Sequence, residues 1–120
     1  MNWPATGAIG LSLAVILGAF GAHALRSRLD AYSMSIWERA VFYHFIHALG
    51  LLIAPLLVRG SAREWVCWLL LAGVVLFCGS LYALAVTGVR MLGAVTPFGG
   101  MSFIAAWIVL GVCLLRGGPR

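Results

Sequence analysis

The stretch "PATGAIGLSLAVILGAFGAHAL", residues 4–25, carries no charged side chain and decides the class of fold. A helix needs about 20 apolar residues to cross roughly 30 Å of hydrocarbon, and this stretch is long enough. The whole chain has the same character, because 63% of its 120 residues are hydrophobic and only 9% are charged. Soluble domains carry about 25% charged residues. The sequence therefore predicts an integral membrane protein.

Three further apolar stretches are long enough, or nearly so, to span a bilayer. With the first, the expected spans are residues 4–25, 40–58, 65–87 and 98–115. The linker "RSRLDAYSMSIWER", residues 26–39, is polar and is expected to contain an interfacial helix over residues 28–38. Short linkers join antiparallel neighbours. The predicted fold is thus all-α: a single domain, residues 1–120, formed by an antiparallel bundle of four transmembrane helices with short loops.

The first span could instead be a signal peptide, because the sequence AHA at residues 22–24 has the form that signal peptidase accepts. Its start, "MNWPATGAIG", lacks a basic region, and the apolar stretch is longer than that of a usual signal peptide. We therefore interpret it as a retained spanning helix. Small residues recur every four positions along it, which predicts a smooth ridge for close helix packing. These residues are Gly10, Ala14, Gly18 and Ala22.

The basic residues are eight arginines with no lysine, and they flank the apolar stretches, where they can bind lipid phosphates. We call the membrane surface that bears residues 26–39 side B and the opposite surface, which bears both termini, side A. The arginines divide evenly, so they do not decide the orientation: insertion in one direction and insertion in both remain open. No basic helix or aromatic-basic pattern indicates nucleic-acid binding. Side B carries Arg26, Arg28, Arg39 and Arg90, and side A carries Arg59, Arg63, Arg116 and Arg120.

The second span, "WERAVFYHFIHALGLL" at residues 37–52, places His44 and His47 three residues apart and so on one face of a helix. Polar groups in hydrocarbon cost several kcal/mol unless they are paired, so they are expected to face inward and to share hydrogen bonds. The other polar residues of the spans fall in the same half of the bilayer, toward side B. The expected buried polar cluster comprises His23, Tyr43, His44, His47, Ser80 and Tyr82.

Three roles are open for these histidines: hydrogen bonds that join helices, a proton or ion path with His47 as carrier, and a metal or haem site. The spacing of His44 and His47 lacks the glutamate and the four-residue interval of a zinc protease, so we expect no metal and no cofactor. Catalysis is not indicated either, because the sequence shows no catalytic triad order or carboxylate pair. The three acidic residues, Asp30, Glu38 and Glu64, lie near the membrane surfaces.

The glycine-rich "TPFGG", residues 96–100, is not a phosphate-binding loop, because no Gly-Lys-Ser/Thr follows it. Thr96 and Pro97 are instead expected to be the N-cap and the first residue of the fourth helix. Gly99 and Gly100 would then allow a neighbouring backbone to come close.

Four motifs resemble those of the YgdD-like proteins, in order and over nearly the whole chain: "GAFGAHAL", which contains Gly18, Gly21 and His23, "YHFIHALGLL", "CGSLYALAVTG" and "AVTPFGGMSFIAAW". These are small four-helix inner-membrane proteins of unknown function with eukaryotic relatives. The resemblance matches His23, Tyr43, His47, the segment 80–82 and the segment 96–100. His44 departs from it, since glutamine is usual there, which argues against a mechanism that needs both His44 and His47.

The resemblance implies a location in a bacterial inner membrane but no established activity. We expect an uncharacterised membrane protein with an accessory, membrane-homeostasis or interaction role, in contact with the lipid bilayer and with no nucleic acid. The alternatives are a small oligomeric transporter or proton-coupled permease that uses a buried histidine, and a metal- or haem-binding membrane protein. A homo-oligomer fits the transporter, because four short spans enclose little room for a path.

Overall fold

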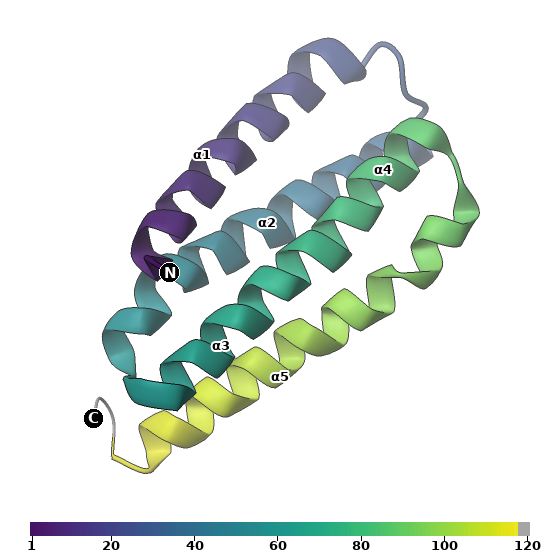
Figure 1. Ribbon diagram of the computed structural model, residues 1–120. Helices are drawn as coiled ribbons and strands as arrows, with labels where there is room; N and C mark the ends of the chain where they lie inside the picture. The colour runs from purple at the N-terminus through teal and green to yellow at the C-terminus, as the bar shows by residue number, and fades with distance from the viewer. Residues whose placement is uncertain (118–120) are drawn as a thin grey trace.

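The computed structural model describes residues 1–117, and all regular structure within them is helical (Figure 1). Four helical segments there are long and apolar enough to cross a membrane, and they run antiparallel in sequence order. The beginning of the first and the end of the last lie at the same end of the molecule (Figure 1). The predicted all-α fold with four candidate spans is therefore confirmed. Arg120, which was placed on side A, lies outside the described residues.

Each span is one helix or a series of stacked helices. The first span is α1 (Trp3–Phe20) followed by the π-helix η1 (Gly21–Leu25), and the second is α2 (Ala31–Leu57). The third consists of α3 (Gly60–Gly73), the π-helix η2 (Val74–Cys78) and α4 (Gly79–Thr87), and the fourth of the 3-10 helix η3 (Arg90–Ala94) and α5 (Thr96–Leu115).

The second helix begins earlier than expected, so the interfacial helix over residues 28–38 is not a separate element. The Asp30 carboxylate caps α2 by accepting a hydrogen bond from the Ser33 backbone N–H at 2.7 Å. No glycine or proline interrupts residues 31–49, so the helix that starts at this cap continues into the membrane. At 27 residues α2 is about 40 Å long, which exceeds the hydrocarbon thickness and leaves its first turns in the headgroup region.

The start of the last helix also differs from the expectation. Thr96 is not an N-cap, because Val95 before it already has helical backbone angles and its N–H donates to the Leu92 carbonyl. The 3-10 helix η3 therefore leads into α5 without an extended residue between them. Pro97 lies in the first turn of α5, where its missing N–H costs nothing. The third helix begins at Gly60 rather than at residue 65, since only residues 58 and 59 are extended.

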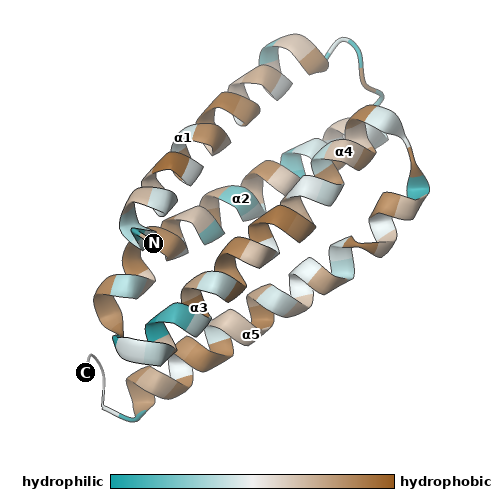
Figure 2. Cartoon of the chain, in the orientation of Figure 1, coloured by the Kyte–Doolittle hydropathy of each residue, from teal (hydrophilic) through white to brown (hydrophobic). Residues whose placement is uncertain are grey.

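The spans form a curved row in which α2 is central. Helix α1 packs on α2, α2 packs on α3 and α4, and α5 packs on α3 and η2. In an apolar stretch of 18 residues within each span, 44% of the residues are buried in the second span, but only 17% in the first and 22% in the fourth. The two end helices thus expose apolar faces, drawn brown in Figure 2, that suit a lipid environment.

The contact between α1 and α2 depends on small residues. A Cβ atom added at Gly7 would lie 2.8 Å from the Ala48 carbonyl oxygen and still closer to the Leu52 backbone nitrogen. Added at Gly18, it would lie 3.3 Å from a methyl group of Val41, and at Gly21 it would collide with the Trp37 indole. The glycines on this face of the first span therefore let its backbone and that of α2 approach each other closely.

We expect Gly7→Ala to push α1 away from α2 and to lower the free energy of unfolding by about 1–3 kcal/mol, as overpacking does in other cores. Thermal unfolding in detergent, followed by circular dichroism, measures this change. Gly111→Ala is the matched control, because nothing lies within 4 Å of a Cβ atom added there. Identical melting curves for the two variants would contradict the close packing at Gly7.

Candidate functional site

His44 joins three helices. It is buried near the middle of α2, and its Nδ1 lies 2.9 Å from the Tyr82 hydroxyl of α4. The His44 ring also interacts with the backbone of Gly10 in α1. A neutral imidazole has one donor and one acceptor nitrogen, so it can satisfy both neighbours at once. His44 therefore links the central helix to the helices on either side of it.

His47 is also buried but packs toward a different helix. Its Nδ1 lies 2.7 Å from the Tyr43 carbonyl oxygen one turn earlier, and because a carbonyl only accepts, Nδ1 carries the proton. The ring lies almost parallel to the Phe103 ring of α5, with centroids 3.4 Å apart and planes inclined by 13°. Tyr43 stacks on it at 5.9 Å. His47 is thus held within α2 and packs between aromatic rings.

Ser80 forms a third, separate contact near side B. Its hydroxyl lies 3.0 Å from the Phe77 carbonyl oxygen, to which it can donate, and 2.6 Å from the Thr96 hydroxyl. The Thr96 hydroxyl also lies 3.5 Å from the Leu92 carbonyl oxygen, so either hydroxyl can be the donor in the bond between Ser80 and Thr96. This pair joins α4 to the first turn of α5. The Thr96 hydroxyl, expected to cap the helix, therefore serves to connect two helices.

His23 does not belong to the buried cluster. It lies in η1 and is exposed, and it has no hydrogen bond within residues 1–117. The inward positions of this turn are occupied by Gly21 and Leu25 instead. The six residues expected to form one pocket are therefore divided among four places: His44 with Tyr82, His47 with Tyr43, Ser80 with Thr96, and His23 alone.

Glycines make room for the aromatic rings around this region. A Cβ atom at Gly99 would lie 2.7 Å from the Phe77 Cα, so α5 and η2 touch through their backbones there. Gly100 is less demanding, because its nearest neighbour is the Phe77 ring at 3.7 Å. At Gly73, which the sequence analysis did not single out, a Cβ atom would collide with the Phe103 ring.

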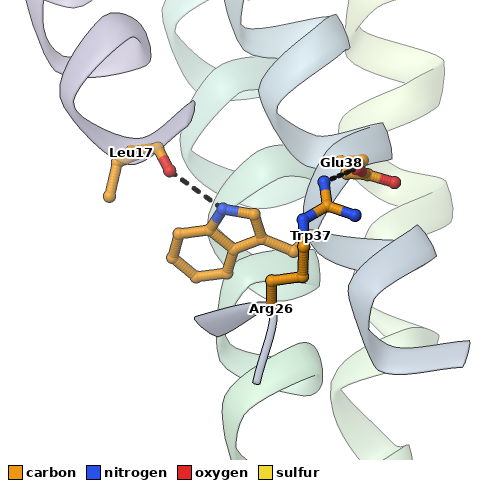
Figure 3. Close-up of polar contacts among 4 residues, drawn as sticks. All are labelled: Leu17, Arg26, Trp37 and Glu38. Carbon is orange, nitrogen blue, oxygen red and sulfur yellow. Dashed lines mark hydrogen bonds and ion pairs between the residues drawn. The ribbon is translucent and has the colours of Figure 1, made fainter. Parts of the chain in front are cut away.

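Tryptophan contacts near both surfaces were missed by sequence reasoning. The Trp37 indole N–H of α2 donates to the Leu17 carbonyl oxygen of α1 at 2.9 Å, just before α1 passes into η1 (Figure 3). Near it, the exposed Arg26 and Glu38 form an ion pair at 3.5 Å (Figure 3). A buried indole N–H needs an acceptor, so a tryptophan at the edge of an apolar stretch is itself a signal of such a contact.

Side A has a similar contact. Trp3 is fully buried, its indole N–H donates to the Glu64 carboxylate at 3.0 Å, and its ring meets Trp68 edge to face at 4.9 Å. Deeper in the bilayer, the Ser102 hydroxyl of α5 donates to the Leu69 carbonyl oxygen of α3 at 2.6 Å. The Trp3 contacts join the first span to the third at side A, and the Ser102 bond joins the fourth span to the third.

No group of three or more His, Cys, Asp and Glu side chains within the described residues could hold a metal ion. The four candidate spans and the polar contacts between them define a small multi-pass α-helical membrane protein. The chain belongs to the family described as "Protein of unknown function (DUF423)", whose model matches residues 17–100.

Several bacterial membrane proteins are similar in sequence to this chain over nearly their full lengths. A UPF0382 membrane protein of Staphylococcus epidermidis is 49% identical over 113 residues, which cover 92% of each chain. The UPF0382 membrane protein YwdK of Bacillus subtilis is 45% identical over 115 residues, 92% of this chain and 93% of its own. No solved structure matches the chain significantly. With four candidate spans, the chain is a multi-pass protein of the cell membrane.

The bond between His44 and Tyr82 can be measured with a double-mutant cycle. We expect His44→Ala and Tyr82→Phe each to destabilise the protein, with a coupling energy of about 0.5–1.5 kcal/mol, because either change removes the same hydrogen bond. Chemical unfolding in mixed micelles gives the four free energies. Additive effects of the two substitutions would show that the bond contributes nothing to stability.

Proposed function

We propose that the protein is an accessory component of the cell membrane that acts through contacts with lipid and other membrane molecules. The observation that carries the proposal is that buried polar side chains of the spans join one helix to another. His44 bonds to Tyr82, Ser80 to Thr96, and Trp37 to the backbone of α1. Such groups stabilise helix association in hydrocarbon, where the hydrophobic effect does not operate between helices.

The proposal includes no catalytic step. The acidic side chains that could act as general acids or bases lie before or within the first turns of α2 and α3: Asp30 caps α2, and Glu38 and Glu64 are bonded to Arg26 and Trp3. Their engagement in these contacts supports a structural role.

We further infer that the YgdD-like proteins belong among the relatives of this chain, on the strength of the four shared motifs. We also propose that copies of the chain pack side by side through the exposed faces of α1 and α5, which otherwise contact lipid. Chemical crosslinking in native membranes tests this association.

A second candidate function is proton-coupled transport, and one feature of His47 favours it. Its Nδ1 is bonded to the Tyr43 carbonyl oxygen, and within residues 1–117 this is its one described hydrogen bond, which leaves Nε2 available. A histidine nitrogen with a free lone pair inside a bilayer can accept a proton.

Proton flux into liposomes under an imposed pH gradient separates the two candidates. For the accessory role we expect flux equal to that of empty liposomes. We also expect His47→Ala to lower the free energy of unfolding by about 1 kcal/mol, because it removes a buried hydrogen bond. His23→Ala is the matched control, since His23 is exposed and unbonded in the described structure.

Flux that exceeds the blank and disappears in a folded His47→Ala protein would refute the accessory role and establish transport. A melting temperature unchanged by His47→Ala would show that the hydrogen bond between His47 and Tyr43 does not stabilise the fold.

A further inference from the structure

A cavity of about 550 Å³ opens at side B, between the first turns of α2 and the corner that joins α4 to η3. The first turns of α2 precede the apolar stretch that begins at residue 40, and the corner at residues 88–93 follows the one that ends at residue 87, so the cavity lies where lipid headgroups meet hydrocarbon. The hydrogen bonds described above for His44, His47 and Ser80 involve no residue that lines this cavity. Its lining includes Tyr32, Ile36, Leu84, Gly88, Arg90 and Gly93.

The cavity carries a positive charge that is not neutralised within the protein. Arg90 lines it and is exposed, and within residues 1–117 no carboxylate pairs with it. The two acidic groups of side B are engaged elsewhere: Glu38 pairs with Arg26, and Asp30 caps α2. Hydrogen bonds from Ser33 hold the pKa of Asp30 below its usual value, so this carboxylate stays ionised in its cap. The Arg90 guanidinium is therefore free to bind an external anion.

The rest of the lining suits an acyl or glycerol group. Ile36 is 4% exposed and faces the cavity with the half-buried Leu84, so the floor is apolar. Gly88 and Gly93 place no side chains in the space, and the nearest atom to a Cβ added at Gly93 would be a Leu84 methyl carbon at 3.8 Å. The Tyr32 ring, 73% exposed, stands at the rim as aromatic residues do at a membrane interface.

We propose that this cavity binds an anionic phospholipid. The lipid phosphate would pair with Arg90, and the glycerol and first acyl carbons would pack on Ile36 and Leu84. A cationic rim above an apolar floor fits an amphiphile better than a free phosphate ion, which would gain nothing from the floor. The arginine can donate two parallel hydrogen bonds to phosphate oxygens, which a diffuse surface charge does not provide.

The test uses the full chain in phosphatidylcholine nanodiscs, with spin-labelled phosphatidylglycerol or phosphatidylcholine as the probe. The fraction of immobilised label gives the preference for the anionic lipid. We expect Arg90→Gln to lower this preference about fivefold, because the lipid phosphate loses its direct pairing with the guanidinium. Gly93→Leu should lower it as well, because it fills the cavity without changing the charge. Arg28→Gln, an exposed side B arginine outside the cavity, should change it by less than about twofold.

Three results would overturn the proposal, provided that melting curves show each variant to be folded. Equal losses in Arg90→Gln and Arg28→Gln would indicate diffuse surface charge. No loss in Gly93→Leu would show that the lipid does not enter the cavity. Release of labelled phosphatidylglycerol by inorganic phosphate, but not by chloride of equal ionic strength, would identify free phosphate as the ligand.

Discussion

A bilayer core offers no water to a polar group, so a buried N–H, hydroxyl or imidazole in a span is stabilised by a partner inside the protein. This constraint explains why the backbone is helical throughout each span, with local π-helical turns at η1 and η2 rather than breaks. It also explains where the polar side chains are bonded. His44, Ser80 and Ser102 each bond to an atom of another helix, and those bonds fix which helices are neighbours.

Much of this fold follows from the sequence, because length and hydropathy report directly on what can cross a membrane. The helix boundaries do not, since hydropathy marks the edge of the hydrocarbon and not the residue at which hydrogen bonding begins. Asp30 shows the difference: its cap starts α2 nine residues before the apolar stretch that begins at residue 40. The cap of α2 is visible in the sequence only as an acidic residue in a polar linker.

The polar site was predicted less well, for a geometric reason. Three residues of helix rotate a side chain by about 300°, so His44 and His47 share a face but are turned toward different neighbours. Which neighbours these are depends on the order of the helices in the row, which one sequence does not specify. His23 poses a related problem. In the last turn of a helix, a small rotation of the backbone decides whether a side chain faces the bundle or the surroundings.

The row order itself has a consequence for how the protein is made. Most contacts between spans join helices that are adjacent in the sequence and are therefore synthesised one after the other, and the Trp3 contact between α1 and α3 is an exception. Low contact order of this kind favours fast and local assembly. During insertion at a translocon, α2 can pack on α1 as soon as it enters the bilayer, and each later span finds its main partner already in place. Assembly can therefore proceed in step with translation.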